Sequence, residues 1–519
     1  MKIYSDISRL LYFALKNNII TDEDVIYCRN EIMSYLNLES WIDNEYDNDI
    51  EEYPQNILNR IIDYAIKNNI IENTIDAKDL FDTKIMGVLS PFPREIIDNF
   101  NYLAKNNSIE DATDYFYNFS KKINYIRTER IAKNIVWNYM SNYGNLEITI
   151  NLSKPEKDPK EIAEQKELSN TSKKNNNYPK CLLCYENIGY NNRLDHPARK
   201  NLRVLPLVLG DEKWYMQYSP YVYYNEHAIV FCKEHRPMVI DEKAIKRILD
   251  YVELFPHYFL GSNADLPIVG GSILSHDHYQ GGRHEFPMAK AKLKKQIIFK
   301  GFEDVESHLV EWPLSVIRLK HKNKEKLLEL SKKIMETWKN YSDEIVNIIS
   351  HTNGERHNTV TPVARKRGEL FELDIVLRNN RTDEEHALGI FHPKKDYHNI
   401  KRENIGVIEV MGLAVLPGRL KKEMDTIANY IIDSATEKDL IEKIKSDADT
   451  EKHCEWFLKM KDITFDKMKN YKFEEIINNI LYKYIGITFE KCLEDSGVYK
   501  NNLEGEKGFL RFIDRVNSL

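Results

Sequence analysis

Residues 270–282, GGSILSHDHYQGG, place two histidines and a glutamine at alternate positions between glycine-rich flanks. Side chains of an extended chain point alternately to opposite faces, so His276, His278 and Gln280 are expected on one face. The residues between them are expected on the other face. The pattern therefore predicts a strand that presents two imidazoles and an amide along one strip.

The glycines around this strip suit a phosphate-bearing ligand, because no side chain holds the ligand away from the backbone amides. His278, neutral near pH 7, is expected to attack an α-phosphorus and form a phosphoramidate. Gln280 can donate a hydrogen bond to a phosphoryl oxygen, but it cannot activate water as a third histidine could. The strip favours group transfer over hydrolysis, although a single histidine is more often exposed or packed in a core.

The sequence CLLC places Cys181 and Cys184 at a spacing that lets two thiolates occupy adjacent corners of a tetrahedral zinc site. Since no second Cys-x-x-Cys follows, histidines would have to complete the site. The candidates in the same half of the chain are His196, His227, His235, His276 and His278. We favour His235 and His276, while two buried thiols without a metal, or a redox pair, remain the alternative.

Composition is typical of a soluble globular protein. The 519 residues, 42% hydrophobic and 30% charged, are enough for roughly two to four domains. Six cysteines in so long a chain do not indicate a disulfide framework. No apolar run reaches membrane length, and no apolar segment follows a basic start, so the cytoplasm is the expected location.

The net charge of −7, without a basic tail or run, argues against a nucleic acid partner. A small anionic substrate would instead need local cations, which the second half of the chain offers in VARKRGE and VLRNNR. Arginine can bind phosphate through two parallel hydrogen bonds, although any one such residue is more often a solvated surface charge. The candidate substrate contacts are Asn263, Arg365, Arg378, Arg381 and Glu409.

The order of patterns predicts an α+β protein. Residues 1–140 repeat an A-(L/I)-K-N-N-I-I stretch, which predicts helices that end on Asn-Asn and restart from Asp, Thr or Glu-rich caps. Strand patterns begin at NLEITINL, and after a polar linker at 153–180 KWYMQYSPYVYYNEHAIVFCKEH predicts a β-hairpin. Helical patterns return over residues 431–519.

The histidine strip, the Cys-x-x-Cys pair, RHNTVTPVARKRGELFELDIVLRNNRTDEEHALGIFHP and ENIGVIEVMGLAVLPGRL together resemble the type 2 family of galactose-1-phosphate uridylyltransferases, within the histidine-triad superfold. The resemblance covers most of the chain. It implies two histidine-triad-like halves with an antiparallel sheet, over 141–300 and 301–430, flanked by N-terminal and C-terminal helical regions. The second half would contain FELDIVLRNN and NIGVIEVMGL.

The resemblance implies an enzyme of galactose metabolism, in the Leloir pathway, that exchanges UMP between UDP-glucose and galactose 1-phosphate by a ping-pong mechanism. His278 would become uridylyl-histidine, and Gln280 would hydrogen-bond the transferred phosphoryl group. A homodimer and no organic cofactor are expected. By analogy with the type 1 enzymes, which have proline where this chain has Asp277, a structural Zn2+ would be held by Cys181, Cys184, His235 and His276.

Two other functions compete with this interpretation. A histidine-triad nucleotide hydrolase or phosphorylase would share the histidine strip, but a third histidine in place of Gln280 would be expected in a hydrolase. A zinc-bearing nucleic-acid-binding protein would explain CLLC and the arginines, but the net charge of −7 argues against it. The uridylyltransferase is the favoured function.

Overall fold

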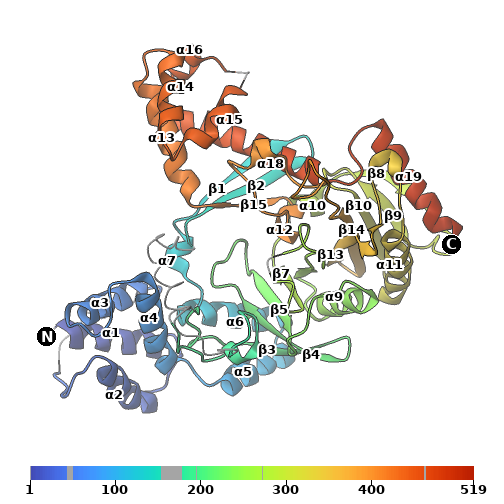
Figure 1. The fold of residues 1–519 in the computed structure, drawn as a ribbon. Helices are drawn as coiled ribbons and strands as arrows, with labels where there is room; N and C mark the ends of the chain where they lie inside the picture. The colour runs from blue at the N-terminus through green and yellow to red at the C-terminus, as the bar shows by residue number, and fades with distance from the viewer. Residues whose placement is uncertain (1, 44–50, 154–177, 194–195, 272, 461–462) are drawn as a thin grey trace. The chain divides into compact units, whose positions relative to one another are not determined.

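The computed structural model describes residues 2–43, 51–153, 178–193, 196–271, 273–460 and 463–519 (Figure 1). The chain forms two compact units. Unit 1 consists of Met1–Lys133 with Ser153–Arg236, and unit 2 consists of Asn134–Leu152 with Pro237–Leu519. Most of the linker expected at 153–180 lies outside the described residues, and the four-region division expected from the sequence stays a prediction.

The first stretch of unit 1 is helical, as expected. Amphipathic helices bury one face, with residues such as Ile7 in α1, Leu58 and Ile61 in α3 and Phe116 in α6. The helices are α1 (Lys2–Lys16), α2 (Val25–Tyr35), α3 (Gln55–Lys67), α4 (Ile75–Leu89), α5 (Pro93–Asn106), α6 (Ile109–Lys122) and α7 (Thr128–Ile131), drawn in blue to cyan in Figure 1.

The Asn-Asn helix ends predicted from the sequence are confirmed at all three places, and left-handed backbone follows at two of them. Asn18 and Asn69 adopt left-handed backbone with φ of 52° and 55°, whereas Asn107 has φ of −119°. Asparagine tolerates this conformation because its short polar side chain bonds locally. The following helices begin at capping side chains, the predicted Thr74 and also Ser108, whose Oγ1 and Oγ accept backbone N–H groups at 3.3 and 3.0 Å.

The second stretch of unit 1 contains three antiparallel strands in consecutive order. They are β3 (Leu205–Leu209), β4 (Glu212–Tyr218) and β5 (Ala228–Cys232). The predicted hairpin is confirmed by the β4–β5 pairing. Alternation along β4 buries Trp214, Met216 and Tyr218, each 0% exposed, so this strand faces the core on one side.

Unit 2 begins with a hairpin, β1 (Ile135–Ser141) and β2 (Gly144–Asn151), and a distant strand, β15 (Leu413–Pro417), pairs in parallel with β2. The strand pattern expected at NLEITINL is β2. Strand β1 was missed, because residues 1–140 were expected to be helical. The alternation of IVWNYMS between half-buried and exposed residues was the signal for it.

The larger sheet of unit 2 has the strand order β7-β6-β13-β14-β10-β9-β8 and is antiparallel, which confirms the α+β class. Helices α9 (Glu242–Leu254) and α11 (Lys324–Lys339) pack against it. The strands are β6 (Phe259–Gly261), β7 (His278–Gly282), β8 (Leu293–Ile297), β9 (Glu306–Val310), β10 (Val316–His321), β13 (Asn358–Arg367) and β14 (Leu370–Asn379), and β11 (His351–Thr352) pairs separately with β12 (Glu355–Arg356).

Helices complete unit 2, as the sequence predicted for its end. NIGVIEVMGL forms the short helix α12 (Val407–Val410) and the turn before β15, so it is not part of the larger sheet. Within the described residues, no helix combines the length and the apolar character that crossing a membrane requires. The remaining helices are α10 (Pro287–Lys290), α13 (Arg419–Asp433), α14 (Glu437–Ser446), α15 (Cys454–Leu458), α16 (Phe465–Met468), α17 (Phe473–Glu475), α18 (Tyr482–Ser496), which continues a π-helical turn at Ile476–Leu481, and α19 (Leu503–Ser518).

A buried ion pair joins helix α4 to the segment after α6 in unit 1. Arg127 Nη2 donates to Asp82 Oδ1 at 3.0 Å, Nη1 contacts the other carboxylate oxygen, and Nη2 also donates to Thr83 Oγ1 at 3.1 Å. The two charged side chains are 8% and 2% exposed. Removing either charge would leave its partner buried and uncompensated.

Substitution Arg127→Met is expected to lower the free energy of unfolding by about 3–5 kcal/mol, because the Asp82 carboxylate loses its counter-ion in a buried site. Lys133→Met is the control, since Lys133 meets Glu129 at 3.7 Å on an exposed surface and should change stability by about 0.5 kcal/mol or less. Urea unfolding followed by circular dichroism compares the two variants. Equal midpoints for both would contradict the structural role of the buried pair.

Candidate active site

The histidine strip is carried by strand β7 and by the bend that precedes it. His276 lies in the bend and the strand begins at His278, so the extended segment starts two residues later than predicted. Within β7, His278 and Gln280 lie on one face of the sheet, as predicted. His278 is 6% exposed and Gln280 is half-buried.

Gly281 lets the neighbouring elements approach the opposite face of β7. A Cβ at this position would lie 2.6 Å from Phe259 O and 2.9 Å from Leu260 Cδ1, both in β6, and 3.5 Å from Tyr251 Cε1 in α9. Any side chain here would push the strand away from β6. The glycine thus serves the close packing of β6, β7 and α9.

A backbone hydrogen bond fixes the imidazole of His278. Its Nδ1 lies 2.8 Å from the carbonyl oxygen of His276, and because a carbonyl can only accept, Nδ1 carries the hydrogen. The Nε2 lone pair is then available for nucleophilic attack. Burial and, to a smaller extent, the neighbouring His276 ring lower the pKa of His278 to about 4, against the opposing effect of the hydrogen bond to the His276 carbonyl, so the ring is neutral at pH 7.

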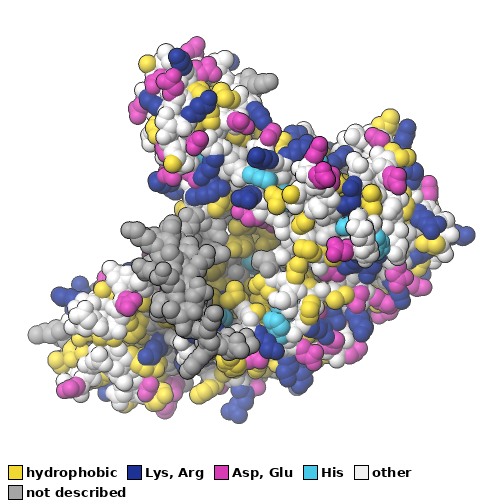
Figure 2. All heavy atoms as spheres, viewed as in Figure 1, with side chains coloured by type: hydrophobic (Ala, Val, Ile, Leu, Met, Phe, Trp, Pro, Cys, Tyr) yellow, Lys and Arg dark blue, Asp and Glu magenta, His cyan; other side chains and the backbone are white. Residues whose placement is uncertain are grey.

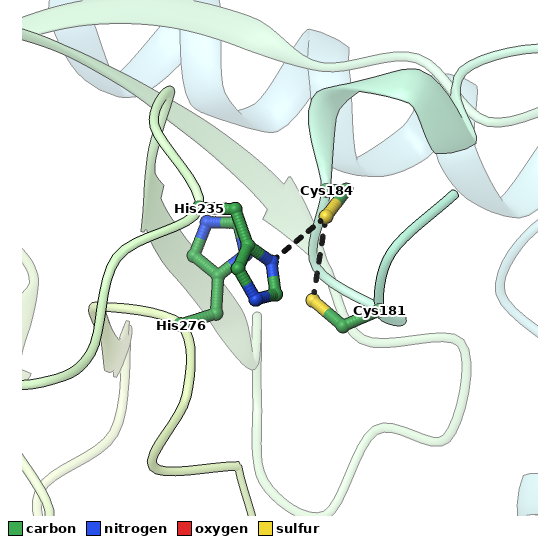
Figure 3. Close-up of side chains that lie close together, drawn as sticks. All are labelled: Cys181, Cys184, His235 and His276. Atoms are coloured by element: carbon green, nitrogen blue, oxygen red, sulfur yellow. Dashed lines mark hydrogen bonds between the residues drawn. The ribbon is translucent and has the colours of Figure 1, made fainter. Parts of the chain in front are cut away.

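The four predicted metal ligands lie together, with their ligand atoms all within 4.8 Å of one another (Figure 3). Within unit 1, the sulfurs of Cys181 and Cys184 are 3.5 Å apart, and Cys184 Sγ lies 3.2 Å from His235 Nδ1. His276 supplies the fourth donor. Two sulfurs and two imidazole nitrogens are the donor set of many tetrahedral zinc sites, so the cluster could bind a metal ion.

Asn187 holds the turn that carries the two thiols, and sequence reasoning missed it. Its Nδ2 donates to the carbonyl oxygens of Cys181 and Cys184 at 2.9 and 2.8 Å. Its Oδ1 lies 2.6 Å from Nε2 of His196, one of the histidines considered as a ligand from the sequence. His196 therefore supports the turn through Asn187. A polar residue three positions after Cys184 was the only sequence signal.

Three of the predicted substrate contacts gather around residues 405–409 in unit 2. Asn263 Oδ1 accepts the backbone N–H of Val407 at 2.8 Å, and Arg378 Nη2 donates to the carbonyl of Ile405 at 2.9 Å. Glu409 accepts from the backbone N–H of Gly406 at 3.2 Å and pairs with Lys401 Nζ at 2.9 Å. Arg378 is 1% exposed, and burial lowers its pKa to about 10 while Glu409 opposes the shift.

The other two predicted contacts make different interactions. Arg365 Nε donates to Glu372 Oε1 at 2.6 Å and its Nη2 contacts Asp374, so both carboxylates of β14 hold this guanidinium within the sheet. Arg381 donates to the carbonyl of Asn347 at 2.9 Å. The contacts of Arg365 are those of a structural ion pair, since the residue is 8% exposed.

Charges on the visible surface are mixed. On the face shown in Figure 2, acidic and basic side chains of the described residues are interspersed over most elements. Proteins that bind the nucleic acid backbone instead gather lysine and arginine along one face or stripe.

Two family models match the chain. The one described as "Galactose-1-phosphate uridyl transferase, N-terminal domain" matches residues 18–237, and the corresponding C-terminal domain matches residues 251–450. A solved crystal structure of yeast Ap4A phosphorylase aligns with a TM-score of 0.31 and 11% identity, over 64% of this chain and 88% of that chain. A score this low does not establish a shared fold.

Curated relatives match over their full length. Proteins named galactose-1-phosphate uridylyltransferase are 56% identical in Fusobacterium nucleatum and 50% identical in Clostridium acetobutylicum, each over 99% of both chains. The Bacillus subtilis protein of that name is 45% identical over 100% of this chain and 98% of its own. With both domain models matched in order, these identities establish that the chain belongs to the galactose-1-phosphate uridylyltransferase family, a family of nucleotidyltransferases.

Proposed function

We propose that this protein exchanges UMP between UDP-glucose and galactose 1-phosphate, giving glucose 1-phosphate and UDP-galactose, through a uridylyl-histidine at His278. The hydrogen bond from His278 Nδ1 to the His276 carbonyl carries this proposal, because it leaves Nε2 as a neutral nucleophile. Family membership supports the two substrates. The reaction belongs to galactose metabolism.

The first half-reaction transfers UMP to the protein. His278 Nε2 attacks the α-phosphorus of UDP-glucose, the bond from that phosphorus to the bridging oxygen breaks, and glucose 1-phosphate leaves with the electron pair. The His276 carbonyl accepts the Nδ1 hydrogen and stabilises the positive charge that develops on the ring. A covalent intermediate divides one difficult displacement into two easier steps.

The second half-reaction discharges the intermediate. A phosphate oxygen of galactose 1-phosphate attacks the same phosphorus, the phosphorus–nitrogen bond breaks, and the electron pair returns to Nε2. Gln280, on the same face of β7, donates a hydrogen bond to a phosphoryl oxygen in both steps. Its amide has no basic nitrogen that could activate water, which favours transfer over hydrolysis.

We assign the remaining substrate contacts to groups that converge in unit 2. Glu409 would accept a sugar hydroxyl, and Asn263 would approach a phosphate, since both side chains position the backbone at Gly406 and Val407. Arg378 would add positive charge beside this segment. Arg365 and Arg381 are weaker candidates, because Arg365 is held by Glu372 within the sheet and Arg381 donates to the backbone away from residues 405–409. A cytoplasmic homodimer stays a prediction.

We assign the metal cluster to a structural Zn2+ held by Cys181, Cys184, His235 and His276, because two sulfur and two nitrogen donors fit tetrahedral zinc. A bound zinc would fix the bend at His276 and take no part in the transfer. No organic cofactor enters either half-reaction. The metal would therefore support activity through the position of His278.

Mixing the protein with UDP-glucose alone is expected to increase the intact mass by one uridylyl group, because the first half-reaction needs no acceptor. His278→Ala should abolish the gain, and added galactose 1-phosphate should discharge it from the parent protein. Mass spectrometry after an alkaline quench measures both changes. A parent that releases UMP without gaining mass would instead indicate a hydrolase.

Gln280→Ala is expected to slow single-turnover uridylylation roughly 10²–10³-fold, the usual loss when one donor to a charged transition state is removed. Gln296→Ala is the matched control, because Gln296 lies in strand β8, which is exposed along most of its length. Rapid-quench kinetics with UDP-glucose compares them. Equal rates for the two variants would rule out a transition-state role for Gln280.

Cys184→Ser is expected to lose about one zinc ion per chain and to unfold at a lower temperature, since serine is a poor zinc ligand. Cys28→Ser is the control, because Cys28 is also buried but its Sγ donates to a backbone carbonyl, that of Val88, at 3.8 Å. Metal analysis by mass spectrometry and calorimetry measures both properties. Retention of zinc by Cys184→Ser would exclude the assigned ligand set.

A further inference from the structure

The face of β7 opposite His278 meets an arginine from helix α9. Nη1 of Arg247 lies 3.5 Å from Asp277 Oδ2 and 3.3 Å from the hydroxyl of Tyr279. All three side chains are buried, with 4%, 3% and 0% of their surface exposed. One guanidinium nitrogen therefore contacts both residues that flank His278 in the sequence.

Asp277 connects this contact to the orientation of the nucleophile. The carbonyl that accepts the hydrogen of His278 Nδ1 belongs to the peptide group between His276 and Asp277. Because the Asp277 side chain is held, rotation of that peptide group is limited. Because the Tyr279 side chain is held, movement of the backbone after His278 is limited as well. The two contacts thus restrain the backbone before and after the nucleophile.

Helix α9 is well placed to act as a rigid support. It packs against β6 and β13, and Tyr251, one turn after Arg247, lies 3.5 Å from where a Cβ of Gly281 would be. Arg247 and Tyr251 therefore cover the same side of β7. The predicted common face of Asp277 and Tyr279 is confirmed, since both side chains turn toward this helix.

We propose that Arg247 is a positioning residue for the transfer reaction: by holding Asp277 and Tyr279, it keeps the His276 carbonyl bonded to His278 Nδ1 and keeps Nε2 aimed at the phosphorus. This inference rests on the proposed uridylyl transfer. A catalytic group displaced by about 1 Å can lose roughly 10²-fold in rate, so a buried support away from the substrate can control the chemical step.

The test uses variants that do not leave a buried charge alone, because Arg247→Met by itself would leave Asp277 uncompensated. The double variant Arg247→Met/Asp277→Asn removes both charges, and Tyr279→Phe removes only the hydroxyl. Arg247→Lys keeps the positive charge and should restore part of the rate. Lys246→Met is the matched control, since Lys246 is on the same helix and pairs with Asp250 on its surface.

In the full-length protein, the double variant is expected to show single-turnover uridylylation by UDP-glucose slowed roughly 10–100-fold, with the Kd for UDP-glucose changed less than about threefold. Histidine labelled with ¹⁵N gives a second readout that needs no substrate. The parent should show His278 as the Nδ1–H tautomer, identified by its loss in His278→Gln, and the double variant should show both tautomers. Lys246→Met should match the parent in both measurements.

Folded variants with the parent rate and the parent tautomer would overturn the role of Arg247. A parent that UDP-glucose does not label would instead refute the proposed function, and the ¹⁵N spectra would still decide whether Arg247 positions the ring. A double variant whose affinity for UDP-glucose falls by the same factor as its rate, with an unchanged tautomer, would also overturn the inference. The slower rate would then reflect weaker substrate binding.

Discussion

The hydrogen bond between the His278 ring and the His276 carbonyl is the constraint on which the site depends. This hydrogen bond selects one tautomer of His278. It forms where the chain bends at His276 before entering β7. His276 contributes twice, because its ring belongs to the cluster that could bind a metal ion and its carbonyl holds the ring of the proposed nucleophile. The elements around the bend, β6 and α9, are packed closely enough that Gly281 has no room for a side chain.

Much of this site could be predicted from local patterns in the sequence. Alternation places His278 and Gln280 on one face, and the Cys-x-x-Cys spacing identifies Cys181 and Cys184 as possible ligands. The bend at His276 could not be predicted, because a period of two assumes extended backbone throughout. Arg247 was also missed. In DEKAIKRILDYVELF, Arg247 lies one turn before Tyr251 on the buried face of the helix. Arginine is rarely buried, and its place here is explained only by the packing of α9.

Arginines show where sequence reasoning is weakest. Arg365 and Arg378 follow similar strand patterns, yet Arg365 pairs with Glu372 and Asp374 across the β13–β14 register, while Arg378 donates to the backbone near Glu409. Which carboxylates face an arginine depends on register, and register is a long-range property. Helix ends are local, and the Asn-Asn ends at Asn18 and Asn69 were therefore predictable.

The two units alternate along the chain, so they are completed at different stages of synthesis. The hairpin β1–β2 is translated between the two stretches of unit 1, yet it belongs to unit 2, where β2 pairs with β15. Unit 1 has all of its residues once Arg236 has left the ribosome. The pairing of β2 with β15 must wait until Leu413–Pro417 has been synthesised, and so distant a pairing carries a loop-closure entropy that the local β1–β2 hairpin does not. Strand β7, which carries His278, lies in the unit that is completed last.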